Sequence, residues 1–193
     1  MIEGLGDMLT HYCKDPMVYN GKQLSSLWAY KNFGLRGDSI VSFRGPCRVE
    51  FTEMVDLEDV LAKSPIYGPD MLHFIAEHFD SDLEKMVLRQ RLFIAIVKDV
   101  LGKYTRELTR SGDDLYLGGK KLSISIATAT PVSVMMHTAL NIDSRGTPVP
   151  TVGLLELGAA EKEISGLAGE ICEAYAAEVK GIYMARCKVR GVT

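Results

Sequence analysis

The stretch Ser111–Ala129 reads SGDDLYLGGKKLSISIATA and joins a charged turn to a strongly alternating strand. The dipeptide Gly118-Gly119 can adopt the positive φ that a tight hairpin turn requires. Apolar residues then occupy every second position of Leu122–Ile126, which is typical of a half-buried strand. Lys120 and Lys121 lie between the turn and the strand. They are either solvated turn residues or, for a lysine fixed on a stiff strand, a cation that faces an anionic ligand.

The segment that follows predicts the hairpin partner of this strand. Residues 133–142 alternate again, and Thr130-Pro131 ends the strand at 121–128. A connection of about four residues suits a hairpin, so we expect the two strands to pair antiparallel. His137 then lies on the opposite side of its strand from the apolar residues Met136 and Leu140.

Two long helices are indicated by apolar residues at helical spacing. Ser81 and Glu84 form a capping-box signature at the start of a helix over residues 81–101. A second helix is predicted over residues 159–180, ending at Gly181.

The first part of the chain predicts a short helix and several strands. Residues 23–33 have helical spacing and stop at Gly34. The dipeptide Gly45-Pro46 predicts a turn that ends the strand before it. The predicted strands cover residues 39–44, 48–55 and 71–79.

This order of elements predicts an α+β fold. Helix, strands, helix, strands and helix do not alternate as βαβα, so a doubly wound parallel sheet is not expected. We predict a mixed, largely antiparallel sheet with helices 81–101 and 159–180 packed on one face. No linker, internal repeat or low-complexity tract divides the chain, so residues 1–193 are predicted to form one domain.

Composition narrows the function classes. The net charge is −3 with no extended basic run, so no nucleic-acid partner is expected. The first 17 residues lack the features of a signal peptide and the most apolar run, Leu92–Leu101, is too short for a membrane span, so we expect a cytoplasmic protein with no membrane partner. The cysteines are scattered, which favours free thiols over disulfides and argues against zinc; they are Cys13, Cys47, Cys172 and Cys187.

The residues around the two lysines resemble a known family. Asp113–Ser123, DDLYLGGKKLS, is similar to the segment that biotin and lipoate protein ligases write as Asn-Asp-Leu, a Gly-basic turn and Lys-Leu-Ala. Met136-His137 and Leu140–Ile142 resemble a His-Gly…Leu-Asn-Val stretch of octanoyltransferases in the same superfamily. The resemblance covers about residues 82–143. It implies a class II biotin/lipoyl ligase-like fold, in a small single-domain branch of the group.

The resemblance also implies an activity and a site. Lys121 matches the catalytic lysine that contacts the carboxylate and the nucleotide phosphate while an acyl-adenylate forms, and Asp114 matches the acid that helps to hold Mg²⁺ and ATP. The implied ligand is a small carboxylic acid of the lipoate, biotin or octanoate kind, with a carrier protein as acceptor. The remaining ligand-binding candidates are Gly119, Ser123, Arg44 and His137.

Three departures separate this chain from the family. The ligases carry a Gly-rich loop that encloses the acyl group and nucleotide, but the comparable interval here is only Ser64–Asp70. Ile124 occupies the place of a glycine and narrows the space over the lysine. No cysteine lies between Asn141 and Ile171, which disfavours transfer through a thioester. A non-catalytic module that binds a small acid or nucleotide is therefore the alternative to an enzyme.

Several candidates also have purely structural interpretations. Arg44 either binds an anion or pairs with an acid between Glu50 and Asp59. His137 is either a ligand contact or a packed, hydrogen-bonded core histidine. His73 and Glu77 share a strand face as metal ligands would, but no nearby spacing supplies further ligands, so no metal site is predicted.

The apolar stripe of helix 81–101 yields a stability prediction. Phe93→Ala should lower the free energy of unfolding by about 3 to 5 kcal/mol, because it removes buried surface and leaves a cavity. Lys98→Ala, on the other side of the same helix, should change it by less than roughly 0.5 kcal/mol. Urea denaturation measures both, and equal losses would mean that the buried face is assigned wrongly.

Overall fold

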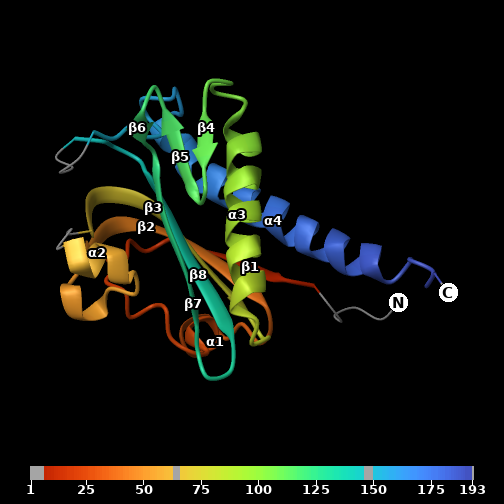
Figure 1. Ribbon diagram of the computed structural model, residues 1–193. Coiled ribbons are helices and arrows are strands. Elements are labelled where there is room, and N and C mark those ends of the chain that lie inside the picture. The colour runs from red at the N-terminus through yellow and green to blue at the C-terminus, as the bar shows by residue number, and fades with distance from the viewer. Residues whose placement is uncertain (1–6, 63–65, 146–149, 193) are drawn as a thin grey trace.

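The computed structural model describes residues 7–62, 66–145 and 150–192 and has an α+β architecture (Figure 1). Its elements in chain order are β1 (Leu9–Cys13), α1 (Trp28–Phe33), β2 (Ser39–Val49), the 3-10 helix η1 (Phe51–Glu53), α2 (Leu57–Ala62), β3 (Ile66–His78), α3 (Leu83–Leu101), β4 (Thr109–Ser111), β5 (Asp114–Leu117), β6 (Lys120–Lys121), β7 (Ser123–Ala129), β8 (Val134–Asn141), the 3-10 helix η2 (Glu161–Glu163) and α4 (Ile164–Arg186).

A five-stranded mixed sheet forms the centre of the molecule. Its strand order is β1-β2-β3-β8-β7, in which β1 is parallel to β2 and the other neighbours are antiparallel. The predicted hairpin is confirmed, because β7 and β8 pair with Ala129 opposite Val134. The shorter strands β4, β5 and β6 form a separate three-stranded sheet that contains the Gly118-Gly119 turn.

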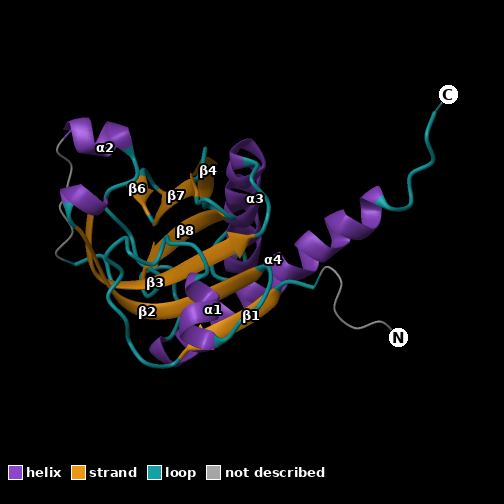
Figure 2. Cartoon of the chain, turned by 90° about the horizontal axis from the view of Figure 1, so that it is seen from below, coloured by secondary structure: helices purple, strands orange, loops and turns teal. Residues whose placement is uncertain are grey.

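The two faces of the sheet have different covers (Figure 2). Helices α3 and α4 pack on one face, α4 over β1 and β2 and α3 over β7 and β8. Leu72, Phe74 and Met136 point toward these helices in the larger core. On the opposite face, α1 contributes Trp28 to a smaller core. Successive residues of one strand therefore point alternately into the larger core and the smaller core, as the period of a strand requires. The predicted placement of both long helices on one face is confirmed.

Several predicted boundaries were wrong. Strand β2 does not end at Gly45-Pro46 but continues to Val49, with a shift of register between Gly45 and Cys47. Residues 48–55 are not one strand, because the chain turns into η1 after Val49. Strand β3 begins at Ile66, five residues before the predicted strand start at 71.

The helix ends also differ from the sequence-based expectations. Helix α1 begins only at Trp28, and Asp82 caps α3 by accepting a hydrogen bond from the Lys85 amide at 2.9 Å. Helix α4 continues past Gly181 to Arg186, since a single exposed glycine costs a helix only about 1 kcal/mol. Among the described residues, no helix has the length and apolar character needed to cross a bilayer.

The irregularity at Gly45 lets a second segment approach β2. The Met17 amide donates to the carbonyl of Arg44 at 2.9 Å, and the Tyr19 amide donates to that of Pro46 at 2.9 Å. A Cβ atom added to Gly45 would lie 2.0 Å from the Met17 carbonyl oxygen. Only glycine therefore allows this backbone contact.

The same irregularity holds a pair of buried histidines. His73 Nε2 lies 3.0 Å from the Gly45 carbonyl oxygen, and His73 Nδ1 lies 3.0 Å from His137 Nε2. Burial lowers the pKa of His73 to about 4, against weaker raising effects of the Gly45 hydrogen bond and the Asp70 charge. Burial and the neighbouring His73 lower the pKa of His137 well below its usual value. Both rings are therefore neutral at pH 7.

The contact at Gly45 yields a stability prediction. Gly45→Ala should lower the free energy of unfolding by roughly 3 kcal/mol, because the new methyl group meets backbone that cannot rotate away. Gly166→Ala in α4 is the matched control, since nothing lies within 4 Å of an added Cβ atom there. The control should be neutral or stabilising by about 0.5 to 1 kcal/mol. Equal destabilisation in urea would contradict the role given to Gly45.

The histidine pair predicts a pH dependence of stability. The unfolded chain takes up protons at these histidines below about pH 6.5, whereas folded His73 does so only near pH 4. Stability is therefore full above pH 6.5 and falls between pH 6.5 and 4, by roughly 3 kcal/mol from His73 alone. The double substitution His73→Phe and His137→Phe should flatten this slope when urea denaturation is repeated across this pH range, whereas Gly166→Ala, which removes no titratable group, should not. An unchanged slope in the double variant would refute the assignment.

Candidate functional site

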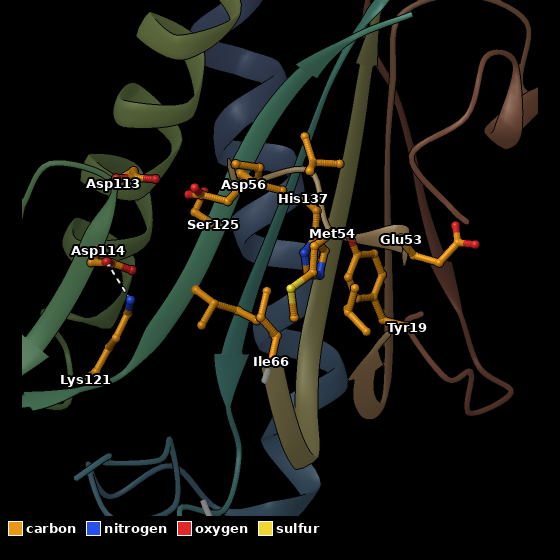
Figure 3. A pocket seen from close by; sticks show the side chains of 14 residues that line it. Tyr19, Glu53, Met54, Asp56, Ile66, Asp113, Asp114, Lys121, Ser125 and His137 are labelled. Atoms are coloured by element: carbon orange, nitrogen blue, oxygen red, sulfur yellow. Dashed lines mark ion pairs between the residues drawn. The ribbon is translucent and has the colours of Figure 1, made fainter. Parts of the chain in front are cut away.

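A cavity of about 210 Å³ opens on the sheet face opposite α3 and α4 (Figure 3). Its walls come from β7, β8 and the β5–β6 hairpin on one side and from the segment around η1 on the other. A site of this volume suits a small ligand. The lining residues are Tyr19, Val49, Glu53, Met54, Val55, Asp56, Ile66, Asp113, Asp114, Lys121, Ile124, Ser125, Ile126 and His137.

Lys121 and Asp114 lie together in this cavity. Lys121 Nζ is 2.8 Å from Asp114 Oδ2, with the two side chains 34% and 19% exposed. They are brought together because β5 and β6 pair through the Gly118-Gly119 turn, with Lys121 opposite Tyr116. An ammonium group has three donors, so two remain for a ligand when Asp114 takes one. Lys120 is exposed.

Burial and charge act on this pair in opposite directions. Burial disfavours the ammonium form, but the hydrogen bond and charge of Asp114, together with Tyr116 and Asp113, raise the pKa of Lys121 overall. Burial raises the pKa of Asp114, and Lys121 only partly offsets it. Lys121 is therefore a cation at neutral pH, and Asp114 retains part of its desolvation cost even when paired.

Two further candidates of the motif, Ser123 and Gly119, belong to the backbone framework around this pair. Ser123 is fully buried, and its Oγ accepts a hydrogen bond from the Leu115 amide at 2.9 Å and lies 3.5 Å from Asp114 Oδ1. Gly119 has φ 80°, which a turn of this kind requires. Neither residue lines the cavity, so their predicted ligand contacts stay predictions.

A buried amide fixes the upper rim of the cavity. Gln90 on α3 donates from Nε2 to Asp113 Oδ2 and to Ser125 Oγ, both at 2.8 Å. Ser125 Oγ in turn lies 3.0 Å from Thr138 Oγ1. Asp113 and Ser125 are thus held on the cavity wall by a helix of the main core.

His137 lines the cavity from β8, away from the β5–β6 hairpin. The Tyr19 ring stacks on it with centroids 3.5 Å apart and an interplanar angle of 11°. In Figure 3 this stacked pair lies across the cavity from Lys121 and Asp114. His137 is thus the packed, hydrogen-bonded histidine of one interpretation, and it also borders the cavity, so its ligand contact stays a prediction.

Arg44 is a further candidate that does not line the cavity. Its guanidinium donates to Asp70 through Nε at 2.9 Å and through Nη2 at 2.5 Å, and Nη1 pairs with Glu161. Its acidic partners therefore do not come from the interval Glu50–Asp59, as one interpretation of the sequence supposed. Arg44 is in the middle of β2, so its ligand role stays a prediction without support from this geometry.

The positions at which this chain departs from the ligase pattern can be located in the structure. Residues 66–70, in the interval compared with the Gly-rich loop, belong to β3, while 63–65 lie outside the described residues. Ile124 lines the same cavity as Lys121. Glu77 accepts from the Leu27 amide and the Ser133 hydroxyl, and the described part of the chain holds no group of three or more His, Cys, Asp or Glu arranged for a metal ion.

Gln90 and Tyr19 are among the site residues that were not predicted from the sequence. Gln90 lies on the apolar stripe of helix 81–101, where a lone amide is itself a signal of a buried polar contact. Tyr19 follows an irregular segment with no periodicity. Its place depends on the contact of Met17 with Arg44 and Gly45, which no local pattern reveals.

Solved structures of low sequence identity share this fold. A biotin protein ligase from Aquifex aeolicus in complex with biotin and ATP aligns with a TM-score of 0.60 and 12% identity, over 90% of this chain and 71% of that chain. A bipartite lipoate protein ligase from Thermoplasma acidophilum aligns with a TM-score of 0.53 and 11% identity, over 93% and 92% of the two chains. The ligase-like fold expected from the resemblance is thus confirmed.

More similar relatives have no assigned activity. A protein of unknown function from Pyrococcus horikoshi aligns with a TM-score of 0.91 and 40% identity, over 96% of this chain and 100% of that one. The uncharacterized protein MJ0805 of Methanocaldococcus jannaschii is 42% identical over 177 residues, which are 89% of this chain and 79% of that protein. A family model described as a domain of unknown function, DUF366, matches residues 8–190, so the chain belongs to the DUF366 family.

Proposed function

We propose that this protein binds a small carboxylic acid in the cavity at Lys121 and activates it with ATP and Mg²⁺. The observation that carries the proposal is the pairing of Lys121 with Asp114 on the wall of a cavity of small-molecule size. The fold that this chain shares with the ligases supports the same proposal. Acceptance of the activated acyl group by a carrier protein is the corresponding second step.

The cavity offers separate surfaces for the two ends of such an acid. The two donors that Lys121 has left can bind one carboxylate, and a compact ammonium suits this anion. Ile124, Ile126 and Val49 provide apolar contact for a hydrocarbon chain or ring. The acid would therefore lie along β7 with its carboxylate at the β5–β6 hairpin.

The charge of the cavity decides how a nucleotide could bind. Among the described lining residues Lys121 is the one Lys or Arg, against Glu53, Asp56, Asp113 and Asp114. A triphosphate alone would meet mostly negative charge. Mg²⁺ is bound in proteins by one or two carboxylates together with phosphates, and Asp113 and Asp114 are two adjacent carboxylates that fit this donor set. Nucleotide binding should therefore require Mg²⁺, with the base outside the cavity.

The cysteines support adenylation over a thioester route. Burial raises the pKa values of Cys47 and Cys172 to about 12, so both thiols are protonated at neutral pH. A thiolate is the nucleophilic form of cysteine. Neither residue lines the cavity.

A non-catalytic small-acid or nucleotide-binding protein is the second candidate. The interval compared with the Gly-rich loop of the ligases, Ser64–Asp70, belongs in part to β3. Ile124 lines the cavity and narrows it. Both features fit a site that binds an acid without enclosing a nucleotide.

Substitution of the lysine tests the proposed acid site. Lys121→Ala should weaken the binding of lipoate, biotin or octanoate by about 1.5 to 3 kcal/mol, since it removes a charged hydrogen bond. The free energy of unfolding should change by less than about 1 kcal/mol, because the side chain is partly exposed. An acid at 100 times its dissociation constant should raise the melting midpoint of the wild type by roughly 5 to 10 °C.

A neighbouring lysine and a second assay complete the experiment. Lys120→Ala removes the same charge from an exposed position and should leave binding unchanged. Magnesium-dependent exchange of labelled pyrophosphate into ATP, seen only with the bound acid, would support the enzyme. Binding without exchange would favour the non-catalytic candidate, and equal binding by all three proteins would refute the acid site at Lys121.

A further inference from the structure

The hydrogen-bond chain behind the cavity fixes which atom His137 presents to a ligand. It runs from the Gly45 carbonyl through His73 to His137, with two contacts of 3.0 Å. A carbonyl oxygen can only accept, so His73 Nε2 carries a hydrogen. Neutral His73 then has no hydrogen on Nδ1, which must accept from His137 Nε2.

The other nitrogen of His137 is consequently a hydrogen-bond acceptor. The neutral ring carries its single hydrogen on Nε2, so Nδ1 has a free lone pair. No residue among those described donates to this atom, although His137 is only 2% exposed and borders the cavity. The stacked Tyr19 ring holds the imidazole in place from one side.

None of the described lining residues donates a hydrogen bond to His137 Nδ1. Glu53, on the same side of the cavity as Tyr19 and His137, carries a carboxylate that only accepts. Lys121, the one Lys or Arg among the described lining residues, lies across the cavity beside Asp114. One end of the cavity therefore offers a cationic donor for a carboxylate, whereas His137 Nδ1 and Glu53 are acceptors at the other end.

We infer that the acid selected by this site carries an N–H or O–H donor away from its carboxylate, and that this group donates to His137 Nδ1. The inference rests on the proposed function and names its substrate class: acids with a hydroxyl, amide or urea group rather than purely hydrocarbon or dithiolane acids. A hydrocarbon tail would displace water from the acceptor without replacing its hydrogen bond, which is unfavourable. His137 would thus be a specificity-determining residue.

Matched acids test this inference directly. Calorimetry at pH 7 with octanoate and ω-hydroxyoctanoate compares two probes that differ by one hydroxyl group, and butanoate and hexanoate with their ω-hydroxy forms cover shorter chains. The wild type should bind one hydroxy acid about tenfold more tightly than its partner, the factor expected for one net hydrogen bond. His137→Phe keeps the ring stacked on Tyr19 and should remove the preference by weakening the hydroxy acid alone. Lys121→Ala should weaken both acids equally.

The outcomes separate this inference from the proposed function. If Lys121→Ala weakens both acids but the wild type does not prefer the hydroxy form, the inference fails and the acid site stands. If no acid binds, both fail.

A measurement on the wild type does not depend on a folded variant. Nitrogen-15 NMR of the free protein should show His137 Nδ1 unprotonated, and its resonance should move on addition of a hydroxy acid and not of the matching hydrocarbon acid. A protonated Nδ1, or equal movement with both acids, would overturn the inference.

Discussion

The hydrogen bond between His73 and the carbonyl of Gly45 is the contact on which the site depends. Pro46 has no N–H to donate, and the register of β2 and β3 shifts between Gly45 and Cys47. The missing side chain of Gly45 also admits Met17, and the chain then carries Tyr19 onto His137. One irregular dipeptide thus sets the hydrogen on His73, the orientation of His137 and the position of the aromatic ring over it.

The two faces of the central sheet carry different features, the larger core on one and the cavity on the other. The face under α3 and α4 holds most of the buried apolar side chains, and the opposite face carries the cavity. Gln90 links the two, because it belongs to the buried side of α3 and yet holds Asp113 and Ser125 on the cavity rim. Changes to the cavity residues Lys121 and His137 can therefore alter the cavity while the larger core remains intact.

Sequence reasoning succeeded where local pattern and tertiary structure agree. The hairpin of 121–142 was predictable because two alternating segments flank a proline, and α3 because its apolar stripe continues over five turns. The bulge in β2 was not, since Gly45-Pro46 reads as a turn unless the partner segment at Met17 is known. In the site, the motif singled out Lys121 and Asp114, whose side chains lie together in the structure and whose ligand roles stay predictions. Tyr19 and the neutral form of His137 depend on residues far away in the sequence, and no local signal encodes them.

The main chain around Lys121 is held from two directions. Its amide donates to the Pro150 carbonyl at 3.2 Å, and its carbonyl accepts from the Val152 amide at 3.1 Å and from Asn141 Nδ2 at 3.2 Å. These bonds tie strand β6 to β8 and to the segment that leads toward α4. A ligand that reaches the ammonium group therefore meets a backbone already in its final conformation. The entropy of ordering that backbone is lost during folding, so association need only restrict the side chain.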